Sequence, residues 1–475
     1  MKRQRISQSM ALASIILIGG GFGVGGFGPA AAQDAGAKAA GAQAAGAQTG
    51  GTTLTFGVSS KLSVSDNYNL AVVAPGTSTI LDTTLSFGYL TQTATDRFAF
   101  DIDGVLRASD IPGAGSDLRF DDTNAALSYS REGANSRFSA TADYNRVNLD
   151  FLDPFAFANL SDATLINSSG ILARQNASLK FETGINDPFG FGIELGHKGT
   201  DYSNTTDPSL FDSTTDDIAL TSRLRLSPVA EARARVSQEN YRADDLVNTD
   251  RTTRALSFGL AYELSPVTTL DASVGTQTIE TVGAAKTRGA FGTVSLTRAL
   301  ANGSAGLILD RSFGIEGGRT TITAKRSMDL PSGTLAYSLG VTRGELGGTE
   351  VVGSIAYSQT LPRGDLTASL DRSVQSSTSG NDTLTTNAAL GYTLALTPAS
   401  GMSLDFIYAQ VDNVGTGTAA NTNRSSLRAE YTHELTPDWD LSAGYEYQRR
   451  VTEGAGTANS NTIFMTLGRE FSIRR

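Results

Sequence analysis

The sequence predicts an all-β fold, a single antiparallel up-and-down transmembrane β-barrel of about 22 strands, within a range of about 18 to 24. Three observations predict it. Apolar and polar residues alternate with a period of two from Leu54 onwards. Short turns alternate along the chain with longer polar connections. Tyrosines recur where the alternating stretches end, as in "LSFGLAYELSP" (256–266) and "LRAEYTHELTP" (427–437).

The composition narrows the class of protein. The chain has 475 residues, no cysteine and a formal net charge of −10. Disulfide and thiol chemistry are therefore excluded, and an acidic protein is not expected to bind nucleic acid. Only two histidines are present. Both stand alone near strand ends, so we expect neither an enzyme nor a metal site, and the pattern requires no cofactor.

The N-terminus predicts export. Lys2, Arg3 and Arg5 precede the apolar run "MALASIILIGGGFGVGGFG", and "PAAAQ" then offers a cleavage site after Ala32. Residues 1–32 are therefore predicted to be a signal peptide for passage through the inner membrane. Residues 33–51, rich in Ala, Gly and Gln, form a low-complexity lead-in. The barrel is predicted over 52–475, in the bacterial outer membrane.

The strands show one apolar and one polar face. Leu54, Phe56 and Val58 alternate with Thr, Gly and Ser, and later stretches such as 98–107 and 402–408 repeat the pattern. About ten residues tilted near 45° cross the hydrocarbon layer of a membrane. A propeller would instead repeat a four-stranded blade motif, whereas the unit here is a hairpin.

The connections predict 11 hairpins, since short turns such as "SPVA", "PRG" and "TPDW" alternate with longer polar segments. The longer segments are 66–77, 109–117, 148–172, 201–216, 242–252, 280–287, 314–319, 344–348, 375–383, 411–423 and 450–460. Short turns on one side of a membrane and longer loops on the other are typical of transmembrane barrels.

Aromatic residues predict the two membrane interfaces, where amphipathic rings are favoured. Near the short turns, on the face predicted to contact lipid, lie Tyr89, Tyr129, Tyr262, Tyr392, Tyr431 and Trp439. At the opposite strand ends lie Tyr144, Tyr202, Tyr241 and Tyr408. Packing of these rings between the sheets of a soluble sandwich is the alternative interpretation.

With these features, residues 52–475 resemble bacterial outer-membrane β-barrel proteins, especially the β-barrel porin families of the exopolysaccharide-associated type. The segments that carry the resemblance are "SVSDNYNL" and the last strand "TIFMTLGREF". Members usually end on an aromatic residue that the barrel assembly machinery recognises, whereas here "SIRR" follows Phe471. The resemblance implies a transport or export role. The short lead-in leaves no room for the plug domain of TonB-dependent transporters.

The inward face carries charges that we expect to line an aqueous lumen. We expect these charges either to favour the passage of ions of one sign or simply to form ion pairs on a solvated wall. Four arginines flank the turn "SPVA" and are expected to cluster on one wall. The full set is Arg223, Arg225, Arg233, Arg235, Glu194, Glu231, Glu263, Asp271, Asp310, Asp371, Asp405, Glu430 and Glu446.

The longest loop, 148–172, is unusually apolar, with Phe151, Leu152, Phe155 and Phe157 near its start. Loops of this length usually have a function. Because it is the third external loop, we expect either that it folds inward as a constriction or that it packs on the rim against lipopolysaccharide. The predicted function is passive diffusion of small hydrophilic solutes in an outer membrane of lipid and lipopolysaccharide. The alternative is an accessory barrel for exopolysaccharide export, with polysaccharide as its partner.

Overall fold

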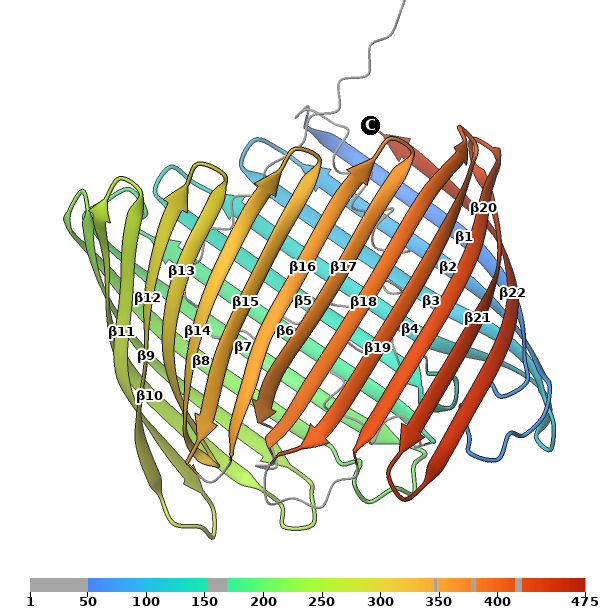
Figure 1. Ribbon diagram of the computed structural model, residues 1–475, viewed down its shortest axis with the longest axis horizontal. Helices are drawn as coiled ribbons and strands as arrows, with labels where there is room; N and C mark the ends of the chain where they lie inside the picture. Colours follow the sequence, from blue (N-terminus) through green and yellow to red (C-terminus); the bar gives the residue numbers. More distant parts are fainter. Residues whose placement is uncertain (1–49, 153–168, 346–347, 377–381, 415–420, 475) are drawn as a thin grey trace, which may run out of the picture.

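The computed structural model describes residues 50–152, 169–345, 348–376, 382–414 and 421–474, and these form one closed barrel of 22 antiparallel strands (Figure 1). Every strand pairs with its neighbours in sequence, and β1 (Gly51–Ser65) pairs with β22 (Gly456–Arg474) to close the ring. The predicted fold class is therefore confirmed. The predicted signal peptide and all but the end of the lead-in lie outside the described residues. Among the described residues, no helix is long and apolar enough to cross a membrane.

The remaining strands have the following bounds: β2 (Ser78–Gln92), β3 (Asp96–Ile111), β4 (Gly115–Glu132), β5 (Ser136–Asn148), β6 (Ile171–Thr183), β7 (Phe189–Ser203), β8 (Ser213–Ser227), β9 (Ala230–Ala243), β10 (Asp250–Ser265), β11 (Thr268–Thr281), β12 (Thr287–Leu300), β13 (Gly303–Gly314), β14 (Gly317–Leu330), β15 (Gly333–Gly344), β16 (Thr349–Leu361), β17 (Gly364–Ser376), β18 (Asp382–Thr397), β19 (Ser400–Asn413), β20 (Thr422–Thr436) and β21 (Trp439–Thr452). One 3₁₀ turn, η2 (Leu149–Phe151), follows β5.

The two ends of the barrel differ in their connections. The end at which β1 starts and β22 finishes, here called the turn end, lies uppermost in Figure 1. Its ten connections have only two to five residues. The opposite end, here called the loop end, carries the longest connections, at 66–77 and 149–170.

Most loop-end connections are shorter than predicted, and in three of them the strands continue almost to the tip of the hairpin. Segments 112–114, 315–316 and 453–455 replace the expected 109–117, 314–319 and 450–460. Glycines with positive φ make such tight turns possible: Gly113 has φ 84° and Gly454 has φ 77°. Polar composition alone did not reveal that the ladder continues through these residues.

The outward face of the wall is apolar, as alternation predicts. On β10, Leu256, Phe258, Leu260 and Tyr262 all project outward and are at least 40% exposed. Their neighbours in sequence face the lumen. An apolar surface of this extent around a closed barrel is stable only in contact with lipid or another apolar phase.

The repeated Leu–Ser/Thr–Pro sequence forms the same local structure four times, at 226–228, 264–266, 396–398 and 435–437. At each, the ladder shifts register at the leucine, which makes a β-bulge. The Ser or Thr oxygen then accepts a hydrogen bond from the backbone N–H two residues on. The motif therefore ends a strand at the turn end and leaves its leucine exposed outside.

Candidate functional site: the lumen and its arginine centre

The lumen contains a cavity of ≈ 2680 Å³. Its lining comes from β1 to β6 and from β16 to β22, and it includes Phe151 and Leu152. Inward polar side chains, among them Lys61, Asp101 and Asn124, border it. A polar interior inside an apolar exterior is the arrangement of a water-filled barrel.

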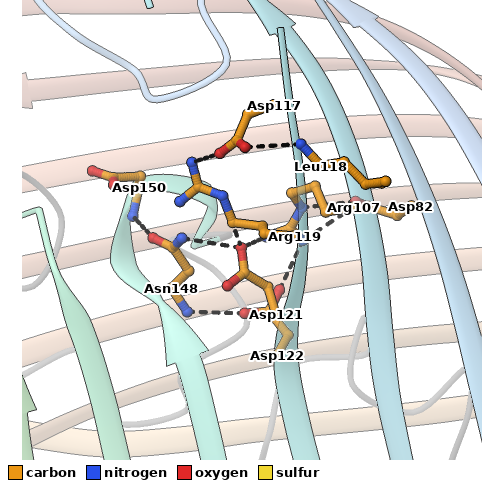
Figure 2. A network of polar contacts seen from close by, with 9 residues as sticks. All are labelled: Asp82, Arg107, Asp117, Leu118, Arg119, Asp121, Asp122, Asn148 and Asp150. Atoms are coloured by element: carbon orange, nitrogen blue, oxygen red, sulfur yellow. Dashed lines mark hydrogen bonds and ion pairs between the residues drawn. The ribbon is translucent and has the colours of Figure 1, made fainter.

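A buried arginine lies on this wall. Arg107 of β3 is 5% exposed and is held by carboxylates from two neighbouring strands. Its Nε lies 2.7 Å from Asp82 Oδ1 on β2, and its Nη2 lies 2.7 Å from Asp122 Oδ2 on β4. Asp121 Oδ2 is 3.8 Å from Nη1 (Figure 2). Three carboxylates thus surround one guanidinium, an arrangement called here the arginine centre.

A β-bulge in β4 makes this arrangement possible. Consecutive residues of a regular strand face opposite sides, yet Asp121 and Asp122 both contact Arg107. The β3–β4 register shifts between Asp103 and Val105, and Asp122 has a positive φ of 46°. The extra residue turns both carboxylates to the lumen. Sequence analysis missed this site, although the outward residues switch from an even position at Phe120 to an odd position at Leu127.

The start of the third loop-end connection is fastened to the arginine centre. Asn148 donates from its backbone to Asp122 Oδ1 (2.9 Å) and from Nδ2 to Asp121 Oδ2 (3.1 Å). Its Oδ1 accepts the backbone N–H of Asp150 (3.1 Å), which caps η2. One asparagine therefore couples the bulge to the turn that places Phe151 in the lumen.

Phe151 covers the arginine centre. Its ring centroid lies 4.4 Å from Arg107 Cζ and 5.9 Å from Arg119 Cζ. The Tyr68 ring, from the loop after β1, lies 5.5 Å away. Cations over an aromatic face are attracted by its quadrupole, so Phe151 is held by charge as well as by burial.

A small apolar cluster provides the second attachment. Leu149, Leu172 and Leu210 are buried together, with Leu152 and Tyr202 packed against them. We call 149–152 the inward segment. Phe151 and Leu152 border the cavity, whereas Phe155 and Phe157 lie outside the described residues, so the constriction stays a prediction.

Two tyrosines predicted at the outer interface belong to the lumen instead. Tyr202 packs in the apolar cluster, and Tyr241 is 6% exposed under Arg251, whose Cζ is 4.6 Å from its ring. On β7 and β9 they share the parity of inward residues, so their position near a strand end was a misleading criterion.

Burial affects the ionisable groups of the long loops. Desolvation raises the pKa of Asp150, and Asp121 raises it further, although Arg119 opposes both. Desolvation likewise raises the pKa of the Tyr68 hydroxyl, with a smaller contribution from Asp150. Both shifts disfavour negative charge next to Phe151.

The arginines around "SPVA" form a second inward group. Across β8 and β9, Arg223 stands opposite Arg233, and Arg225 opposite Glu231. Arg235 Nη1 is 2.7 Å from Glu194 Oε2, and Lys180 Nζ is 3.3 Å from Oε1 of the same carboxylate.

The other contacts of this group are ion pairs and backbone hydrogen bonds. Arg233 binds Asp271, Arg223 Nε lies 3.7 Å from Glu231 Oε2, and Arg223 donates to the carbonyl of Gly184 (2.7 Å). Most of the cluster is therefore neutralised by partners. Its effect on ion preference stays a prediction.

The other predicted lumen charges are distributed around the ring. Asp310 accepts a hydrogen bond from Thr293 (2.6 Å), Asp371 from Ser373 (3.1 Å) and Glu446 from Ser426 (3.1 Å). Glu263 and Asp405 lie on inward parity on β10 and β19. The structure therefore does not gather them into one ring.

Glu430 belongs to a further inward cluster. Phe464 is 1% exposed between Lys61 (4.9 Å) and Arg428 (4.6 Å), and Arg428 lies 2.6 Å from Glu430. Gly444 leaves room for the Phe464 ring, because a Cβ at this position would lie 2.5 Å from Cζ.

The six interface aromatics predicted near the short turns are outward by strand parity. Phe98 packs with Tyr89 (5.9 Å) and Phe138 with Tyr129 (5.9 Å). Trp439 stacks under Arg469, 5.2 Å from its Cζ. The remaining three share this parity: Tyr262 and Tyr431 are exposed, and Tyr392 is half-buried.

No known protein family matches this sequence, and no curated protein matches it either. Solved structures do resemble its fold. The ferric enterobactin receptor PfeA of Pseudomonas aeruginosa shares 12% identity at a TM-score of 0.55, over 90% of this chain and 82% of that one.

Two further structures give the same result. The ferric-catecholate import receptor Fiu of E. coli shares 10% identity (TM-score 0.55, 87% and 81% covered). The FrpB iron transporter of Neisseria meningitidis shares 8% (TM-score 0.57, 90% and 82% covered). At these identities the likeness establishes a shared barrel fold.

Proposed function

We propose that the protein is an outer-membrane channel through which small hydrophilic solutes diffuse passively. The observation that carries the proposal is the ≈ 2680 Å³ cavity, bordered by polar and charged as well as apolar side chains, inside a closed wall with an apolar exterior. The described residues build the wall, its connections and one 3₁₀ turn, and none of them forms a separate domain inside the barrel. The similar barrels are described as receptors and a transporter, which supports a transport role.

We infer that the inward segment narrows the pathway. It is fastened at the arginine centre and in the apolar cluster, and both Phe151 and Leu152 border the cavity. The inward arginines and carboxylates then tune ion preference, as charged side chains do at close quarters in channels. The two features of the lumen thus have separate roles: the inward segment limits the size of the solute, and the charged side chains favour ions of one sign.

Planar-bilayer recording tests the proposal. The purified full chain should give discrete conductance steps, and its reversal potential in asymmetric KCl should report charge preference. Deletion of 151–160 should increase the unit conductance. A barrel that inserts, shown by heat-modifiable migration on gels, yet conducts no ions would overturn the channel proposal. Unchanged conductance in the deletion variant would overturn the constriction alone.

A further inference from the structure

The outward face has an asymmetry that the channel does not use. Near the loop end of β10 to β17, outward positions carry arginines immediately beyond the apolar belt. Arg311 lies two residues beyond the exposed Leu309, and Arg343 two beyond Val341. The complete set is Arg254, Arg288, Arg311, Arg343 and Arg372, here called the arginine belt.

Strand register groups four of these arginines around threonines. Arg254 and Arg288 both pair with Thr278, one from each side. Neighbouring strands are about 4.8 Å apart, so the two Cα atoms lie about 10 Å apart. Here Arg254 Nε donates to Gln238 Oε1 (3.0 Å) and Arg288 Nη2 to the Thr276 hydroxyl (3.4 Å). Both side chains are long enough to rotate towards a ligand bound above Thr278.

The same arrangement occurs a second time. Arg311 and Arg343 both pair with Thr320, and Arg311 Nη1 donates to the Thr320 hydroxyl (3.2 Å). Arg372 makes the equivalent contact with Thr386 (3.1 Å). Two guanidinium groups flanking a hydroxyl form a donor-rich site that suits the oxygens of a phosphate.

The belt has uncompensated positive charge. Ion pairs hold Arg254 to Glu280 (3.5 Å) and Arg311 to Glu345 (2.8 Å). Within the described part of the chain, Arg288, Arg343 and Arg372 have no carboxylate within 4.0 Å. They are bound only by hydroxyl or carbonyl groups or project freely. Three cations without a carboxylate partner therefore lie beside an apolar surface, where an anionic ligand would neutralise them.

The opposite side of the barrel shows that such a belt is not a general property of the rim. There tyrosines bonded to amides occupy several outward positions, and the outward arginines are fewer, Arg146 on β5 and Arg449 on β21. Tyr445 donates to Asn461 (2.7 Å), Tyr447 to Asn459 (3.1 Å) and Tyr408 to Gln410 (2.7 Å). The tyrosines suit an uncharged interface, so the outward arginines are densest on β10 to β17.

We propose that the arginine belt binds the phosphate groups of lipopolysaccharide, whose acyl chains cover the apolar surface below it. An occupant must bring apolar chains and phosphate together at one depth, and a phosphorylated lipid does so. The inference rests on the proposed membrane location but not on the conduction of solutes.

Native mass spectrometry of the purified full-length barrel in detergent tests the assignment, with phosphorylated lipid A as probe. The Arg288→Gln/Arg343→Gln/Arg372→Gln variant should bind it at least tenfold more weakly. Dephosphorylated lipid A should bind weakly to the unaltered protein. Its affinity should be no higher than the affinity of phosphorylated lipid A for the triple variant. A matched control removes three outward arginines at the turn end, Arg298, Arg326 and Arg469, and should keep full affinity.

Three results would overturn the assignment: unchanged lipid A binding in the triple variant, equal binding of the dephosphorylated lipid, or equal loss in the control. The corresponding triple Arg→Lys variant keeps the charge and should retain most of the affinity, which separates binding from any folding defect. Bilayer conductance of the triple variant should match the unaltered protein, so failure here leaves the channel proposal intact.

Discussion

Replacing Phe151 by alanine separates the two attachments of the inward segment. The substitution removes the ring that covers Arg107 at 4.4 Å and faces Tyr68 at 5.5 Å. A partly desolvated cation–π contact contributes about 1 kcal/mol and an aromatic pair about 1 kcal/mol. Loss of about 2 kcal/mol raises the ratio of released to attached segment about 30-fold. The apolar cluster around Leu172 remains, so release should be reversible.

Single-channel recording measures this ratio directly. The unaltered protein should show steady steps, because the segment is attached nearly all the time. Phe151→Ala should show frequent transitions to a higher conductance, with an open fraction about 30-fold greater. Adding Leu149→Ala should prolong these openings, since it removes a buried member of the apolar cluster.

Phe464→Ala is the matched control. Phe464 is also an inward phenylalanine between cations, at 4.9 Å and 4.6 Å, but its cation contacts, Lys61 and Arg428, lie outside the inward segment. Its loss should change the mean conductance at most and add no transitions. If Phe151→Ala records like the unaltered protein, or if Phe464→Ala produces the same transitions, the argument for a segment latched by Phe151 is refuted.

Three further perturbations have defined outcomes. Burial raises the pKa of Asp150 above its ordinary value of 3.8, so the inward segment should be attached most strongly below pH 3.8 and should loosen as pH rises through the raised pKa. Openings should therefore become more frequent with rising pH, and Asp150→Asn should flatten that dependence. Arg235→Gln leaves Glu194 with one fewer cation, so the reversal potential in asymmetric KCl should shift towards cation preference, and no shift would contradict a selective role for this wall. Gly444→Ala forces a Cβ to within 2.5 Å of a neighbouring ring and should lower thermal stability by about 1–3 kcal/mol, whereas Gly259→Ala, where the nearest atom is 3.4 Å away, should be tolerated.

The wall of the barrel could be predicted because one rule applies to every strand: apolar residues face outward and polar residues face the lumen. Leu256, Phe258 and Leu260 show the rule on β10, and the same period gave the strand count and the outward face. The face of a residue was predicted wrongly where its position near a strand end was used instead of its odd or even place in the alternation. Tyr202 lies near a strand end, as an interface residue would, but its parity is that of the lumen.

The arginine centre was harder to predict, because it depends on where strict alternation fails. Among the described non-glycine residues with positive φ, only Asp122 lies within a strand. The bulge at this residue gives Arg107 a second and a third carboxylate and gives Asn148 two acceptors. The shift in outward parity between Phe120 and Leu127 was readable in the sequence, but its consequence was not, since the partners come from strands and loops far apart in the chain.

The interruptions of the alternation are therefore informative in two different ways. At the four Leu–Ser/Thr–Pro sites a bulge ends the strand, and the outcome is a tight turn at the rim of the barrel. At Asp122 a bulge occurs inside a strand, where no turn follows, and it leaves an acidic pair facing inward beside a buried cation. A bulge inside a strand loses ladder pairing without ending the wall, so it persists only if the contacts it creates offset that loss. Here those contacts hold the inward segment, which makes the bulge the structural reason that this segment is fastened at this place on the wall.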